Sequence, residues 1–289
     1  GEKVNYTLYE NGYDEAEGVA SDIAEYVRDG WNYNDVAILY RTNAQSRALE
    51  EKLMIHNIPY KIYGGQNFYQ RKEIKDILAY LKTIDNGLDG QAVKRIINVP
   101  KRGIGNTTID RLQEYADFND ITFWEALVNA KDIDTIKNAA LSKLEPFVDL
   151  IGRLRAKEEF MSLKELAEAV IEDTGYIESL SQNETVEEVE ARRENLDEFI
   201  NKVVSYEESC KEAGEEPTLS GLLEEVALIA DIDNLDESEP HVMLMTLHSA
   251  KGLEFPRVYI NGRRQHFVYL RNSKQFAHAG HLEVRRQGD

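Results

Sequence analysis

The first part of the chain alternates between two hydrophobic periods. Apolar runs predict strands at residues 4–10, 35–41 and 59–65, and helical spacing of apolar positions predicts helices at 14–30 and 44–58. Strand, helix, strand, helix, strand is an order typical of a parallel sheet with crossover helices. The N-terminal region is therefore expected to begin an α/β domain.

From residue 71 to about residue 232 the pattern is almost wholly helical. Ser162 and Glu165 have the spacing of a capping box, and Gly175 is expected to end the helix that they begin. Strand-like runs return only at 241–247 and 257–260. This order predicts an α/β fold in which a parallel-sheet domain is interrupted by a large all-helical insertion.

Composition agrees with a folded chain of two domains, because 289 residues with 42% apolar content can bury two cores. No apolar run approaches the length of a membrane span, and no signal-peptide core follows the first residues. The single cysteine, Cys210, cannot form an internal disulfide, so a cytoplasmic protein is expected. No Cys/His cluster has zinc-ligand spacing, and no metal site is predicted.

The net charge of −19 argues at first against nucleic-acid binding, which depends on Lys and Arg displacing counterions. The charge is unevenly distributed, however. The segment 172–237 is strongly acidic and is interpreted as solvated helix faces rather than as a surface for a basic partner. A local basic island contains Lys94, Arg95, Lys101, Arg102 and Arg111.

The first candidate motif is Leu-Tyr-Arg-Thr-Asn-Ala-Gln-Ser-Arg at 39–47, at the end of a predicted buried strand. Its polar side chains could hold phosphates or bases, and the amides of the following helix start add positive potential: Arg41, Thr42, Asn43 and Gln45. An ordinary strand-to-helix turn with Asn43 as a cap is the alternative.

The second motif lies in the basic island, at 96–116. Apolar residues, a Gly-Ile-Gly turn and a helix that starts with threonines form a helix-hairpin-helix pattern. Gly103 and Gly105 would let backbone amides approach a phosphate, and Lys101 and Arg102 would supply charge. Such a site reads the DNA backbone and not the base sequence. A plain helical hairpin is the alternative.

The third motif, Thr-Leu-His-Ser-Ala-Lys-Gly-Leu-Glu-Phe-Pro at 246–256, joins the two C-terminal strands. Thr246, His248 and Lys251 could contact a nucleic-acid backbone, and Glu254 could accept hydrogen bonds from a ribose. A histidine in a turn is more often structural, but this combination of groups favours a binding site. Loops at the carboxyl ends of parallel strands line the ligand crevice of such folds.

The third motif resembles motif V of the UvrD/PcrA/Rep family of superfamily 1 DNA helicases. The segments 39–47, 63–81 and 98–112 are similar to the same family in the same order, so the resemblance covers residues 1 to about 260. It implies a RecA-like, P-loop NTPase-type fold. The second motor domain would comprise residues 1–72 and 238–262, and residues 73–237 would form its helical accessory subdomain with the helix-hairpin-helix.

The resemblance also implies roles for individual residues. Glu254 would contact the ATP ribose. The single-stranded DNA contacts would be Arg41, Asn43, Thr246, His248 and Lys251. The duplex DNA contacts would be Lys101, Arg102, Gly103, Ile104, Gly105 and Thr107.

Two features depart from the family. No phosphate-binding Gly-x-x-x-x-Gly-Lys-Ser/Thr loop occurs, so the first motor domain is expected to be outside this chain and the chain alone is predicted to be inactive as an ATPase. Residues 263–289 hold six basic and two acidic residues and could not be aligned to the family. We expect this tail to be poorly ordered and to follow a reading-frame change or junction near Gly262.

The sequence therefore predicts a fragment of an ATP-dependent DNA helicase that moves three-prime to five-prime in DNA repair or replication. ATP and Mg²⁺ would act in the complete enzyme, with none bound tightly to this fragment. The expected partners are single-stranded DNA, a duplex junction, the first motor domain, and repair or replication proteins. A non-catalytic DNA-binding or protein-interaction module is the alternative.

Overall fold

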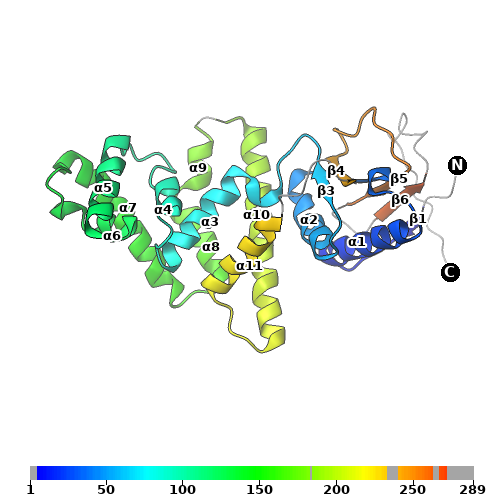
Figure 1. Ribbon diagram of the computed structural model, residues 1–289, viewed down its shortest axis with the longest axis horizontal. Coiled ribbons are helices and arrows are strands. Elements are labelled where there is room, and N and C mark those ends of the chain that lie inside the picture. The colour runs from blue at the N-terminus through cyan, green and yellow to red at the C-terminus, as the bar shows by residue number, and fades with distance from the viewer. Residues whose placement is uncertain (1–4, 183, 233–239, 263–266, 272–289) are drawn as a thin grey trace. The chain divides into compact units, whose positions relative to one another are not determined.

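The computed structural model describes residues 5–182, 184–232, 240–262 and 267–271. The chain divides into two compact units: Gly1–Phe68 together with Asp231–Asp289, and Tyr69–Ala230. The first unit is built around a sheet and the second is helical (Figure 1). Among the described residues, no helix is long and apolar enough to span a bilayer.

The sheet of the first unit has the strand order β1-β6-β5-β2-β4-β3. Four neighbouring strands, β5, β2, β4 and β3, run parallel to one another, and β6 pairs antiparallel with β5 and β1. The strands are β1 (Asn5–Thr7), β2 (Val36–Tyr40), β3 (Tyr60–Ile62), β4 (Val242–Thr246), β5 (Arg257–Ile260) and β6 (Phe267–Arg271). The structure is thus an α/β fold whose central strands come from both ends of the chain.

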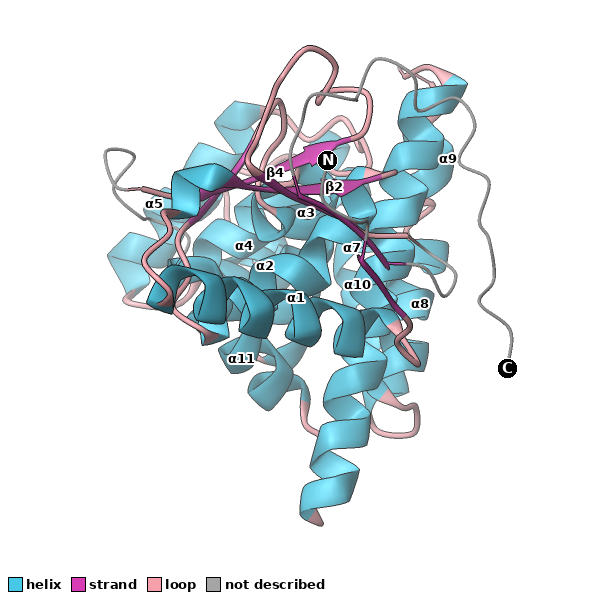
Figure 2. Cartoon of the chain, turned by 90° about the vertical axis from the view of Figure 1, so that its right-hand side faces the viewer, coloured by secondary structure: helices cyan, strands magenta, loops and turns pink. Residues whose placement is uncertain are grey.

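The central strand β2 is buried along its whole length, as the continuous apolar run predicted. Helices α1 (Gly12–Arg28) and α2 (Ser46–Ile55) pack against each other, and both lie on the same side of the sheet (Figure 2). Asn11 begins α1 by accepting hydrogen bonds from two amides, and Gly30, at φ +96°, follows its end. The short connections Tyr33–Asp35 and Asn43–Gln45 are 3-10 turns, η1 and η2.

Two strands differ from the sequence prediction. Strand β1 pairs with β6 and not with β2, so the first strand of the chain is at an antiparallel edge of the sheet. Residues 267–271 form β6, although they lie in the tail that was expected to be poorly ordered. Strand β6 pairs with β5, which precedes it closely in the chain, and with β1, which is far away in sequence, so its place in the sheet depends partly on a distant partner. Residues 263–266 and 272–289 lie outside the described residues.

The second unit is helical, as predicted. Ser162 and Glu165 form the predicted capping box at the start of α8, and Gly175 adopts the left-handed conformation two residues after that helix ends. After the 3-10 turn η3 (Phe68–Gln70), the helices are α3 (Lys72–Asp85), α4 (Gly90–Ile96), α5 (Asn106–Asn119), α6 (Phe123–Val128), α7 (Asn138–Glu158), α8 (Leu163–Asp173), α9 (Tyr176–Leu180), α10 (Val186–Ala213) and α11 (Leu219–Ile232), with the 3-10 turn η4 (Ala130–Asp132) between α6 and α7.

Candidate functional site

The loop that follows β2 presents two polar side chains to solvent. Arg41 and Asn43 are exposed, and neither side chain has a hydrogen-bond or ion-pair partner within the described part of the chain. Gln45 has a different role, because its Oε1 accepts hydrogen bonds from the backbone amides of Arg41 at 2.9 Å and Thr42 at 3.1 Å. Gln45 therefore shapes the turn, and Asn43 is not the side-chain cap that was considered as the alternative.

The loop that follows β4 is folded by Thr246. The Thr246 hydroxyl lies 2.9 Å from the Ser249 hydroxyl and accepts from the Ser249 amide at 3.2 Å, while the Ala250 amide donates to the Thr246 carbonyl at 3.1 Å. Gly252 has a φ of +91°, a conformation that favours glycine. The bonds of Thr246 and this turn leave His248 and Lys251 exposed.

These two loops lie side by side at the carboxyl edge of the sheet. Tyr40 and Thr246 are paired in the parallel register of β2 and β4, and the Leu247 amide donates to the Tyr40 carbonyl at 2.9 Å. The two polar loops thus start at the same level on adjacent strands. The edge gathers a guanidinium, an amide, an imidazole and an ammonium, groups suited to a nucleic-acid backbone and its bases.

Glu254 is placed farther along the crossover from β4 to β5. Its neighbours Leu253 and Phe255 pack, with Ala250, against a buried cluster that includes Leu39. Because strand β2 lies between β4 and β5, this segment crosses one face of the sheet. Glu254 itself is exposed, and its carboxylate has no partner among the described residues.

A buried carboxyl group lies where the chain leaves β5. Glu15, in the first turn of α1, is 7% exposed, and its Oε1 accepts from the Gly262 amide at 3.4 Å. Burial raises the pKa of Glu15 from 4.5 to about 7, against a smaller opposite effect of the Gly262 hydrogen bond.

This raised pKa predicts a pH-dependent stability. The folded state holds the Glu15 proton more tightly than the unfolded state, so stability is lost as the pH rises from 4.5 to about 7. We expect Glu15→Gln to be more stable than the parent by about 2 kcal/mol at pH 8 and equal to it at pH 4, in urea unfolding followed by Trp31 fluorescence in a Trp124→Phe background.

The matched control is Glu17→Gln on the same helix. Hydrogen bonds from Lys52 and His56 lower the Glu17 pKa to about 2, so this variant should lose stability at pH 8. Equal pH profiles of Glu15→Gln and the parent would contradict the raised pKa.

In the helical unit, α4 and α5 flank the predicted Gly-Ile-Gly turn. Gly103 has a φ of +71°, whereas Gly105 has a φ of −80° that any residue can adopt, and a Cβ at Gly105 would meet nothing within 4 Å. Asn98 braces the turn: its Oδ1 accepts from the Ile104 amide at 3.0 Å and its Nδ2 donates to the Ile104 carbonyl at 2.5 Å. The fold therefore requires glycine at 103 but not at 105.

Two of the residues predicted to contact the duplex, Arg102 and Ile104, have side chains that are engaged within the helical unit. Arg102 donates from Nη1 to the carbonyls of residues 96, 97 and 100, and from Nη2 to the Tyr80 hydroxyl at 2.7 Å. Its guanidinium also lies 4.9 Å from the centre of the Phe147 ring. Ile104 is 5% exposed and belongs to the core. Arg102 thus stabilises the turn from within, while Lys101 and Thr107 are exposed.

The rest of the basic island is also used within the unit. Lys94 lies over the Phe123 ring, Arg95 pairs with Asp76 at 2.8 Å, and Arg111 donates to the Thr135 carbonyl at 2.7 Å. Most cations of the basic island therefore form contacts within the helical unit. Sequence reasoning missed Lys143 on α7, whose Nζ donates to the Gly103 carbonyl at 2.8 Å.

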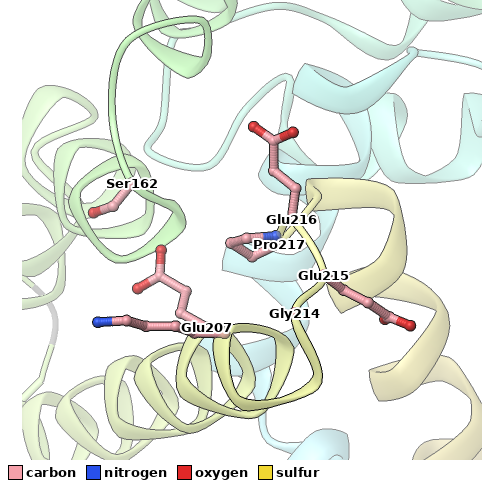
Figure 3. A pocket seen from close by; sticks show the side chains of 7 residues that line it. Ser162, Glu207, Gly214, Glu215, Glu216 and Pro217 are labelled. Atoms are coloured by element: carbon pink, nitrogen blue, oxygen red, sulfur yellow. The ribbon is translucent and has the colours of Figure 1, made fainter.

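A hollow of about 570 Å³ lies elsewhere in the helical unit, between the start of α8 and the end of α10. Figure 3 shows Glu207 directed toward Ser162, while Glu215 and Glu216 point away from it. The Glu207 carboxylate accepts from the Leu163 amide at 2.7 Å and so supports the start of α8. Nowhere in the described ranges do three or more Cys, His, Asp or Glu side chains form a metal-binding group.

The sequence that forms the motif loops and the helical unit was compared with known protein families. Residues 1–279 match the UvrD-like helicase C-terminal domain. The chain belongs to this family. The family prediction is thereby confirmed, and the match extends past Gly262 into the tail that has no recognisable family motif.

Two relatives of this UvrD-like chain are ATP-dependent DNA helicases named PcrA. The chain is 45% identical over 275 residues to the Staphylococcus aureus protein, a match that covers 95% of this chain and 37% of that helicase. It is 43% identical over 275 residues to the Staphylococcus epidermidis protein, with the same coverage of 95% and 37%. The chain therefore spans little more than a third of the length of these curated relatives.

Proposed function

We propose that this chain is part of an ATP-dependent DNA helicase that moves three-prime to five-prime in DNA repair or replication. The sheet-containing unit would be the second RecA-like motor domain, and the helical unit its accessory subdomain. Family membership and the PcrA relatives support this proposal, as does the parallel sheet with polar loops at its carboxyl edge.

The observation that carries the proposal is the register of β2 and β4, which brings two motif loops together. The single strand would be bound by the side chains of Arg41, Asn43, His248 and Lys251. Thr246 would position His248, because its hydroxyl holds the turn that follows it. Two cations with an amide and an imidazole suit a phosphate backbone with bases to either side.

Glu254 fits the proposed role toward a nucleotide, since its exposed carboxylate is free to accept hydrogen bonds from two ribose hydroxyls. ATP with Mg²⁺ would supply the free energy for movement in the complete enzyme. The phosphate loop of such a site would come from the first motor domain, the main protein partner of this chain.

The duplex ahead of the junction would contact the turn between α4 and α5. Gly105 supports this, because its conformation does not need glycine and its free Cβ position leaves room for a phosphate. The exposed Lys101 and Thr107 flank this position in sequence. The contacts would read the backbone and not the base sequence.

The test uses single-stranded DNA binding and ATP turnover. We expect the chain to bind a labelled oligonucleotide, and Asn43→Ala or His248→Ala to weaken this binding by about 1–2 kcal/mol, with Glu254→Gln unchanged as the control. ATP turnover should appear only after the first motor domain is added, and Glu254→Gln should reduce it.

Each result has a clear meaning. DNA binding without turnover in the mixture would favour a non-catalytic DNA-binding module instead. A large loss of DNA affinity in Glu254→Gln would mean that this carboxylate is wrongly assigned to the nucleotide.

A further inference from the structure

The turn after α4 has fewer available cations than the sequence indicates. The Arg102 guanidinium is committed to three carbonyls and the Tyr80 hydroxyl, so it cannot turn to a phosphate without breaking this network. Within the basic island only Lys101 is an exposed cation with no partner in the described part of the chain. One ammonium beside a backbone turn would give only a weak phosphate contact.

A second cation reaches the same turn from α7. Lys143 is exposed, and its Nζ lies 2.8 Å from the Gly103 carbonyl oxygen and 3.5 Å from the position that a Cβ would take at Gly103. Helix α7 thus supplies a side chain to the turn that precedes α5. No carboxylate pairs with Lys143 among the residues that the structure describes, so its charge is not neutralised.

The hydrogen bond to Gly103 leaves donors of the Lys143 ammonium group unused. A lysine head group has three N–H donors, and the Gly103 carbonyl takes one of them. Two donors and the full positive charge stay available on the outer side of the turn. The carbonyl also fixes the flexible lysine stem, so less side-chain entropy is lost when an anion binds.

We propose that Lys143 is a DNA-binding residue, and that it forms with Lys101 a two-lysine clamp for one phosphate group of the duplex backbone at the Gly103–Gly105 turn. The proposal rests on the proposed duplex-binding function and adds a residue from a separate helix to it. Arg102 becomes a positioning residue that holds the turn between the two lysines.

The experiment measures binding of the chain to a short blunt duplex by fluorescence anisotropy at several salt concentrations from about 50 to 200 mM. One phosphate contact contributes about 0.9 to the slope of log K against log salt, which corresponds to about eightfold in affinity at 0.1 M relative to 1 M. Because the two lysines share one phosphate, we expect Lys143→Ala to lower the slope by up to about 0.9 and to weaken binding accordingly.

Three variants separate charge from structure. Lys143→Gln keeps a donor for the Gly103 carbonyl but removes the charge, and should bind as weakly as Lys143→Ala. Lys143→Arg should keep most of the affinity. Lys164→Ala, which breaks a surface pair with Glu168 near the other end of α7, changes the net charge equally and should bind as the parent does.

The outcomes distinguish a failure of the proposed duplex binding from a failure of the proposed role of Lys143. If the parent chain shows no salt-dependent duplex binding, the proposed duplex function itself is lost. If the parent binds and Lys101→Ala lowers the slope, but Lys143→Gln keeps the parent's slope, then Lys143 is only a structural donor and this inference is overturned. An equal loss in Lys164→Ala would also overturn it, since the effect would then be net charge alone.

Discussion

Arg102→Ala is expected to lower the free energy of unfolding of the helical unit by about 3 kcal/mol, whereas Lys101→Ala should change it by less than about 0.5 kcal/mol. The two residues are adjacent in the sequence and carry the same charge. Their surroundings differ: Arg102 is half-buried and Lys101 is exposed.

The large effect of Arg102 follows from what its removal leaves behind. The carbonyls of residues 96, 97 and 100 would lose a charged donor, as would the buried Tyr80 hydroxyl. The face of Phe147 would lose the guanidinium 4.9 Å above it. Hydrogen bonds to charged groups contribute about 1.5–3 kcal/mol, and several are lost together.

The measurement is urea unfolding followed by Trp124, in a Trp31→Phe background so that only the helical unit is reported. Arg102→Lys should restore little, because a single ammonium cannot replace a planar fork of donors. Equal unfolding midpoints for Arg102→Ala and Lys101→Ala would show that Arg102 does not hold the turn.

Asp76→Ala is expected to cost about 3–5 kcal/mol, the largest loss that we predict for the helical unit. Asp76 lies in α3 and is 1% exposed. Its carboxylate accepts from Lys72 at 2.9 Å, Arg95 at 2.8 Å and Tyr176 at 2.7 Å. It therefore links α3 to α4 and α9.

The three partners of Asp76 would be affected differently. The side chains of Lys72 and Arg95 are 51% and 37% exposed, so water can replace the carboxylate there. Tyr176 is fully buried, and its hydroxyl would lose its acceptor. Burial, followed by the Asp76 charge, already raises the pKa of Tyr176, so this hydroxyl stays a donor.

The matched control for Asp76→Ala is Glu168→Ala, which removes one exposed carboxylate from the surface pair with Lys164. This pair should contribute less than about 1 kcal/mol. Both variants are followed by Trp124 fluorescence in urea. Similar losses in the two variants would mean that the Asp76 carboxylate does not hold these helices together.

Most of the fold could be predicted from the sequence because the local pattern of apolar residues agrees with burial in the structure. The strand at 35–41 was predicted from a continuous apolar run, and β2 is buried on both faces. The pairing of β1 with β6 was not predictable in this way. Strand β1 is exposed along its length, so no apolar pattern marks the strand beside it.

The candidate site was partly predictable for a similar reason. The loops that carry Asn43 and His248 start at the same level of the sheet because they follow neighbouring parallel strands, an expectation that topology supplies. The roles of Arg102 and Lys143 could not be read from the sequence. Tertiary packing brings several carbonyls to the Arg102 guanidinium, and it brings Lys143 to Gly103, which is 40 residues away in sequence.

The crossover from β4 to β5 has a mechanical consequence. It is attached at three apolar points, Ala250, Leu253 and Phe255, and its first turn is closed by Thr246. A segment attached at these points has little slack, so we expect a displacement of Glu254 to be passed on toward His248. In the helicase that we propose, in which Glu254 would contact the nucleotide and His248 the DNA, a pull at Glu254 would reach His248 within the same few residues, with no helix or hinge needed as a lever.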